Sequence, residues 1–293
     1  MNAAFGLDHP LLATYNIEGL RKRLIALGFN MTPIGKHPWG TSTSLAMFNG
    51  CLLEIMGIYD DSLIDALPAG DFRFGRHIHT HLQQREGVAL TALHSTGSQR
   101  DAERAAACGF DIAGHLEFGR DVTLPDGRQG RTKTTLALMP DREFPRLSLF
   151  LCQQHRPDLI YVPEWLRHPN GVTGICGVNV IADTGSQPKL NARFSGLYGP
   201  AAQIPGGMAF ATANGTLRIM TPQAFTDHIG PVAEPLRQEQ TPCIAGMDFT
   251  LPDPAALRPF LQASKTAFTE TETTVCLTQP EETANTLLRF CRP

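Results

Sequence analysis

A spacing that occurs twice constrains the fold most strongly. Gly6 opens an apolar segment, and Gly28-Phe29 closes the helical segment that follows it. Gly87 and Gly109-Phe110 repeat this arrangement, and the two glycines of each pair are 22 residues apart. A fixed internal spacing of this kind indicates a duplicated supersecondary unit. We therefore expect a chain built from repeated units.

The first unit, residues 6–59, reads as a strand, a helix and further strands. Asn16 is a suitable N-cap, and it precedes apolar residues at helical spacing. Gly28 is a C-cap signal. Asn49-Gly50 lies between two apolar runs, which is the strongest short hairpin signal.

Related units begin near residues 87, 171 and 243, and Asn214-Gly215 repeats the Asn-Gly turn. We predict an α+β fold of four βαβββ modules, paired into two tandem domains with curled mixed sheets. The domains are expected at 1–158 and 165–293, because prolines cluster between residues 157 and 169. Pairing two modules gives a cup with the first and last strand of each module at its floor.

Composition narrows the function classes. The chain is 42% apolar and 18% charged, with a net charge of −3, and it has no long basic run, so nucleic acid is not an expected partner. No window approaches the roughly 20 apolar residues of a membrane span. The beginning of the chain shows no secretory signal. Seven scattered cysteines without a C-x-x-C motif indicate reduced core residues, and we expect a cytoplasmic protein.

Four short motifs carry a family resemblance. Leu7-Asp8-His9-Pro10, Leu27-Gly28-Phe29, Gly40-Thr41 and Leu53-Glu54-Ile55 resemble the vicinal oxygen chelate superfamily. This superfamily includes glyoxalase I, extradiol dioxygenases, methylmalonyl-CoA epimerase and bleomycin-resistance proteins. Residues 155–171 are similar to its glyoxalase-like branch. The resemblance covers essentially the whole chain and implies the fold more strongly than the reaction, because this fold hosts many functions.

The resemblance implies a metal site. In metal-dependent relatives, a His or Gln on the first strand and a Glu on the last strand bind the ion, and His9 and Glu54 fall on those positions. The partner module would supply further ligands, but Leu90 or Thr91 aligns with His9. Gln153 or His155 would then complete the site. Such ligands suit Zn, Fe, Mn or Ni. Alternatively, His9 and Glu54 bond each other or water across a metal-free cup.

Two functions follow from these alternatives. The first is a lyase, isomerase or dioxygenase of glyoxalase type, in which the metal acts as a Lewis acid on a small oxygenated molecule. Glu54 would be catalytic if it left the metal to take a proton. The second is a metal-free protein that sequesters a small molecule, as resistance proteins do. A homodimer is possible, because the cup can close within the chain or across two copies.

Two further segments have competing interpretations. His77, His79 and His81 alternate as strand ligands of a metal would, but an exposed helix or connecting segment is the favoured interpretation. Basic residues at 128–133 surround a predicted hairpin. They could grip an anionic substrate, although a solvated loop is favoured.

Overall fold

The computed structural model describes residues 4–239 and 241–293. Residues 1–3 and 240, within the two predicted domains, lie outside this part. Module one comprises β1 (Leu7–Ala13), α1 (Ile17–Ala26), β2 (Gly35–Lys36), β3 (Thr41–Phe48) and β4 (Cys51–Ile58). Module two, after α2 (Phe74–Leu82), comprises β5 (Gly87–His94), α3 (Ser98–Ala107), β6 (Gly114–Phe118), β7 (Asp121–Thr123), β8 (Gln129–Arg131), β9 (Thr134–Met139) and β10 (Leu149–Gln154).

The second half of the chain repeats this order. Module three comprises β11 (Gly174–Ile181), α4 (Gln187–Tyr198), β12 (Ala202–Ile204), β13 (Gly207–Ala211) and β14 (Thr216–Met220), followed by α5 (Pro222–His228) and α6 (Glu234–Arg237). Module four comprises β15 (Cys243–Thr250), α7 (Arg258–Ala263), β16 (Phe268–Glu270), β17 (Thr274–Leu277) and β18 (Leu287–Cys291).

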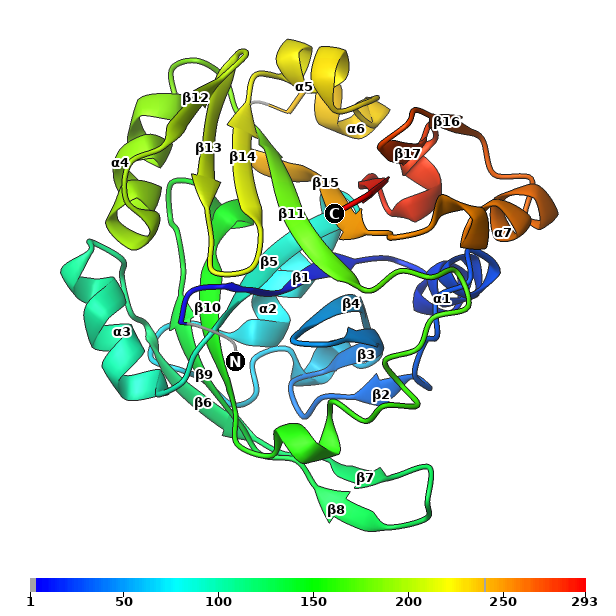
Figure 1. Cartoon of the computed structure of the whole chain (residues 1–293). Coiled ribbons are helices and arrows are strands. Elements are labelled where there is room, and N and C mark those ends of the chain that lie inside the picture. The colour runs from blue at the N-terminus through cyan, green and yellow to red at the C-terminus, as the bar shows by residue number, and fades with distance from the viewer. Residues whose placement is uncertain (1–3, 240) are drawn as a thin grey trace.

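Each pair of modules forms one eight-stranded mixed sheet. The strand orders are β2-β3-β4-β1-β5-β10-β9-β6 and β12-β13-β14-β11-β15-β18-β17-β16. The first and last strands of each module therefore lie in the middle of its sheet. Figure 1 shows the two sheets one above the other, with α3 and α4 on one side and α1 and α7 on the other. The predicted α+β fold of four βαβββ modules is confirmed.

Local sequence signals account for the boundaries of module one. The side chain of Asn16 accepts a hydrogen bond from the Gly19 amide at 2.9 Å, and so caps α1. Gly28 ends this helix with a φ of +81°, a conformation that glycine adopts without strain. Gly50 has a φ of +87° in the tight turn between β3 and β4.

One hydrophobic core joins the two sheets. It contains Leu53 and Leu93 from the first sheet and Val180 and Met247 from the second. The linking segment adds polar contacts, because the ring of His168 meets both the Asn30 amide at 2.9 Å and the Met47 carbonyl at 2.8 Å. Strands of the first sheet come from residues 7–154 and those of the second from 174–291. The exact domain limits stay a prediction, because the two halves share their interior.

The histidine-rich run forms α2, which lies against the first sheet. Phe74, Ile78 and Leu82 are buried in a cluster with residues of β1, β4, β5 and β10. His77 Nε2 lies 2.8 Å from the Ala89 carbonyl oxygen. The predicted helix is confirmed, but its predicted exposure is wrong. The apolar residues of α2 recur every four positions, so one face of the helix packs against the sheet and fills part of the cup.

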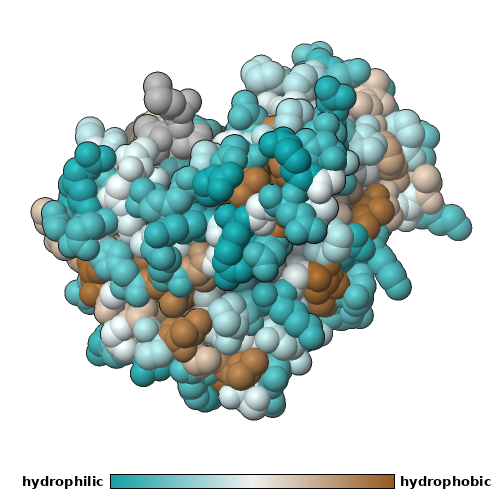
Figure 2. Space-filling model, turned by 90° about the horizontal axis from the view of Figure 1, so that it is seen from below, coloured by the Kyte–Doolittle hydropathy of each residue, from teal (hydrophilic) through white to brown (hydrophobic). Residues whose placement is uncertain are grey.

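The molecular surface shows no single dominant apolar area on the face in Figure 2, where apolar residues form small separate patches among hydrophilic ones. The predicted homodimer stays a prediction. In the part of the chain that the structure describes, no helix has the length and apolar character needed to cross a membrane.

Candidate active site

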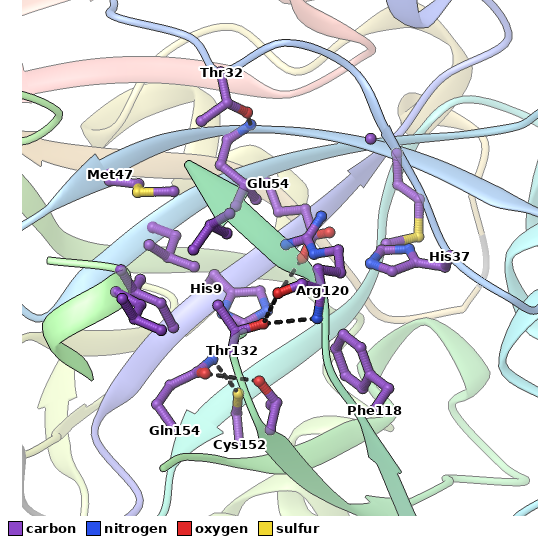
Figure 3. Close-up of a pocket in the computed structure, with 18 of the residues that line it drawn as sticks. His9, Thr32, His37, Met47, Glu54, Phe118, Arg120, Thr132, Cys152 and Gln154 are labelled. Carbon is purple, nitrogen blue, oxygen red and sulfur yellow. Dashed lines mark hydrogen bonds and ion pairs between the residues drawn. The ribbon is translucent and has the colours of Figure 1, made fainter. Parts of the chain in front are cut away.

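A cavity of about 570 Å³ lies between the concave face of the first sheet and three covering segments. The segments are residues 30–37, 118–123 and 159–165. This volume is in the range of small-molecule sites, which bury most of a ligand. The lining is mainly apolar, and Leu45, Met47 and Phe150 belong to it. His9 and Glu54 are among the few ionisable residues in the lining (Figure 3).

The fold brings His9 and Glu54 together as the sequence predicts. His9 lies on β1 and Glu54 on the neighbouring parallel strand β4. His9 Nε2 is 3.2 Å from Glu54 Oε2, and both side chains are more than nine-tenths buried. Thr43 on β3 donates a hydrogen bond of 2.5 Å to Glu54 Oε1. Glu54 therefore has a partner on each carboxylate oxygen.

Asp8 contacts His9 at Nδ1, the ring nitrogen that does not face Glu54. Its Oδ1 is 2.8 Å from His9 Nδ1, and its Oδ2 is 2.9 Å from Nδ1 of His94 on β5. The register of β1 against β5 shifts between Leu7 and His9, which leaves Asp8 as the extra residue of a bulge. Bulges re-aim side chains, and this one lets neighbouring residues of one strand interact. Sequence reasoning missed the role of Asp8, although the residue lies within the Leu7–Pro10 motif.

These contacts set the charge state of the cluster. Burial opposes a charge on His9, but Asp8 and Glu54 outweigh it and raise the pKa of His9 from 6.5 to about 9. Burial likewise opposes ionisation of Glu54, yet His9 and Thr43 help to lower its pKa to about 2. The pKa of Asp8 is held well below its ordinary value by His9 and His94, against the effect of burial. At neutral pH the cluster is therefore an imidazolium between two carboxylates.

His37 is a second imidazole in the cavity lining. Its Nδ1 lies 2.9 Å from Thr41 Oγ1, which leaves Nε2 as the atom that can meet a bound molecule. The ring stacks on Trp39 at 4.7 Å and meets Phe118 edge-on at 5.7 Å. Burial lowers the pKa of His37 to about 4; Glu54 opposes this shift and Arg120 adds to it. His37 is therefore neutral where His9 is charged.

Module two places apolar residues where module one has His9 and Glu54. His9 pairs with Ala92 and Leu11 pairs with Leu90, so the pseudo-symmetric counterpart of His9 is Leu90. By the same register, Phe150 is the counterpart of Glu54. The Phe150 ring packs edge-on against the His9 ring at 5.6 Å. The partner module therefore adds apolar contact here.

The structure does not bring Gln153 and His155 to the His9–Glu54 pair. Neighbouring strand residues point to opposite faces, and Cys152 and Gln154 take the cavity face of β10. Gln153 Oε1 instead accepts a hydrogen bond of 2.7 Å from the Ser98 amide at the start of α3. His155 is exposed, with its Nε2 2.8 Å from Thr135 Oγ1.

The position of Gln153 leads to a stability prediction. Replacing Gln153 with Ala removes an acceptor that caps α3, so we expect a loss of about 1 kcal/mol in the free energy of unfolding, measured by urea denaturation. Ligand binding in the cavity should be unchanged. A variant that left stability intact but abolished binding would show that Gln153 acts in the site.

The donor set falls short of a resident metal ion. The 3.2 Å separation of His9 Nε2 and Glu54 Oε2 is compatible with two ligands of one ion, and Asp8 orients the imidazole as an outer-shell carboxylate does. However, Leu90 and Phe150 supply no donor atoms. Among the described residues, no group of three or more His, Cys, Asp or Glu side chains could hold a metal. Catalytic metal sites use three protein ligands, so we derive no step through a metal.

The second domain fills the corresponding positions with a closed ion-pair network. By the strand register of the second sheet, Gly177 is the counterpart of His9, and Arg218 is the counterpart of Glu54. Arg218 is 2.7 Å from Asp248, which also pairs with Arg289 at 2.9 Å. A Cβ on Gly177 would lie 3.0 Å from Asp248 Oδ2, so the missing side chain leaves room for the network.

The fold is that of the vicinal oxygen chelate superfamily. The chain belongs to the glyoxalase-like domain family, whose model matches residues 7–193. None of the curated proteins shows a significant sequence match.

Solved structures share the fold across the whole chain. A hypothetical protein from Staphylococcus aureus superposes with a TM-score of 0.68 at 10% identity, covering 98% of this chain and 99% of that one. A mutant 4-hydroxymandelate synthase from Streptomyces coelicolor gives 0.62 at 12% identity, covering 100% and 93%. A xylose isomerase-like TIM barrel/4-hydroxyphenylpyruvate dioxygenase fusion protein gives 0.57 at 14% identity, covering 99% of this chain and 49% of the fusion. At these identities the likeness concerns the fold.

Proposed function

We propose that the chain is an enzyme of lyase or isomerase type, which moves a proton on a small oxygenated molecule held in the first-domain cavity. The observation that supports this proposal is that His37, held at Nδ1 by Thr41, lines the same cavity as the His9–Glu54 ion pair. Burial lowers the pKa of His37, whereas Asp8 and Glu54 raise the pKa of His9 against the effect of burial. Groups held in different protonation states are what general acid–base chemistry requires.

Each residue has a distinct part in this scheme. His37 Nε2 accepts a proton from a carbon next to a carbonyl group. The imidazolium of His9 stabilises negative charge that develops on the carbonyl oxygen when the bound molecule takes over the Nε2–H that faces Glu54 in the unliganded chain. Glu54 and Asp8 keep His9 charged and oriented.

Proton exchange tests this proposal directly. The chelator-treated full chain is incubated in D2O with hydroxyacetone and 2-oxobutyrate, and deuterium uptake next to the carbonyl is followed by proton NMR. We expect uptake above the uncatalysed rate, and a fall of about 100-fold or more in His37→Gln, in the range for loss of a general base. Arg128→Gln, a change at a three-quarters exposed side chain, is the matched control.

Two other outcomes would replace the proposal. Exchange that appears after addition of Zn, Fe, Mn or Ni, and is lost in His9→Ala and Glu54→Ala, would establish the metal-assisted reaction predicted from the sequence. Binding without exchange would favour a protein that sequesters its ligand. A specific observation supports that second function, since the oxygens of Glu54 already have protein partners. The ligand roles of His9, Glu54, Gln153 and His155 stay a prediction until metal content is measured.

A further inference from the structure

Arg120 is a cationic side chain in the cavity lining that the proposed reaction does not use. It lies between β6 and β7, in a segment contributed by module two, and it is half-buried. Its guanidinium makes no hydrogen bond or ion pair with any residue that the structure describes, whereas its main chain is fully engaged. A positive group at a mainly apolar cavity needs an acceptor, which water or a ligand must supply.

The surroundings of Arg120 hold it in place. Its amide donates to Thr132 Oγ1 at 2.9 Å, and its carbonyl accepts from the Thr132 amide at 2.8 Å. This approach requires Gly119, because a Cβ there would lie 2.2 Å from the Thr132 carbonyl oxygen. On the other side, a Cβ on Gly35 would lie 3.1 Å from Arg120 Nη1. Two glycines therefore leave room for an arginine that points into the cavity (Figure 3).

The nearby carboxylates are not direct partners of Arg120. The negative charge of Glu54 acts on Arg120 only at longer range, because the two carboxylate oxygens of Glu54 are engaged by Thr43 and His9. Asp121 also lines the cavity, but it pairs with Arg131 at 2.8 Å. The N–H donors of Arg120 are therefore left for a bound molecule.

We propose that Arg120 receives the carboxylate of a small monoanion whose apolar remainder fills the cavity. This inference rests on the proposed function, since it names the class of molecule on which the same site acts. A planar guanidinium matches a carboxylate through two parallel hydrogen bonds. A phosphate dianion would call for more positive charge, and the cavity lining contains no lysine.

The apolar remainder of the ligand has a defined environment. Phe118 lies two residues before Arg120 and meets the Trp39 ring edge-on at 5.1 Å. Leu136, Met47 and Phe150 add further apolar lining, and the Phe150 ring contacts the His9 ring. A carboxylate on Arg120 would thus leave the body of the ligand between the aromatic cluster and the His9–Glu54 pair.

Matched pairs of ligands test the inference by isothermal titration calorimetry on the full chain. The probes are 3-phenylpropionate and hexanoate, each compared with its neutral amide, together with phenyl phosphate. We expect at least one carboxylate to bind wild-type protein tenfold or more tightly than its amide. Arg120→Gln should abolish this advantage, Arg120→Lys should retain part of it, and Arg128→Gln should retain all of it.

Several results would overturn the inference. These are equal affinity for acid and amide, an advantage that survives Arg120→Gln in a variant with an unchanged circular dichroism melt, no binding of either carboxylate, or tighter binding of phenyl phosphate. Each result is a binding measurement, so it is separate from proton exchange. If His37→Gln lost exchange but the protein showed no preference for carboxylates, the proposed function would stand and the role of Arg120 would be overturned. If carboxylates bound through Arg120 but no exchange occurred, the role of Arg120 would stand and the proposed function would be overturned.

Discussion

Asp8→Ala is expected to lower the free energy of unfolding by about 3–5 kcal/mol at pH 7, the range found when one partner of a buried ion pair is removed. Asp8 is 1% exposed and contacts Nδ1 of both His9 and His94. Its removal leaves two buried imidazoles without their acceptor. Urea denaturation followed by circular dichroism measures the loss.

An exposed ion pair supplies the control for this variant. Asp65 pairs with Arg76, and about half of each side chain is exposed. Asp65→Ala should therefore change stability far less than Asp8→Ala does. If Asp8→Ala cost no more than Asp65→Ala, the Asp8–His9–His94 arrangement would not be a stabilising element, and its role in orienting His9 would lose support.

The second large effect is a dependence of stability on pH that belongs to His9. Its pKa is raised to about 9 in the folded chain from 6.5 in the unfolded chain. Below pH 6.5 both states bind the proton, and the stabilisation is fully present. Between pH 6.5 and 9 the folded state binds more protons than the unfolded state, so stability falls as pH rises. The loss over this range is about 3 kcal/mol.

A comparison with His9→Gln isolates this contribution. Groups remote from the cluster titrate in both proteins, so the difference in the free energy of unfolding between wild type and variant reports His9 together with the two carboxylates that it contacts. We expect this difference to shrink by about 3 kcal/mol between pH 6.5 and 9.5, in urea titrations at closely spaced pH values. A difference that stayed constant with pH would show that His9 is not charged at neutral pH.

The sequence predicted the fold and half of the site. The Asn16 cap, Gly28 and the Asn49-Gly50 turn are local signals, and each lies within a few residues of the chain, while the repeated 22-residue glycine spacing indicated the duplication. His9 and Glu54 were found because they are polar residues in apolar strands. Their proximity followed from the expected pairing of first and last strands.

The rest of the site depends on information that is absent from local patterns. Gln153 and Gln154 are neighbours in sequence, and the register of β10 alone decides which of the two side chains faces the cavity. Asp8 reaches His94 because of a bulge that the sequence does not signal. Arg120 gave no signal either, since a lone arginine beside a hairpin looks like a solvated residue. His37 did have a sequence signal, because it lies four residues before Thr41, close to the Gly40-Thr41 motif of the family resemblance.

Histidine NMR tests the central claim most directly, namely that His9 is an imidazolium held between two carboxylates. Long-range proton–nitrogen spectra of 15N-labelled, chelator-treated protein report the protonation of each ring, and His9→Gln and His37→Gln assign the signals. At pH 7 we predict that both ring nitrogens of His9 are protonated, with a titration near pH 9, and that His37 is neutral and titrates near pH 4. A neutral His9 at pH 7, titrating near 6.5, would contradict the account.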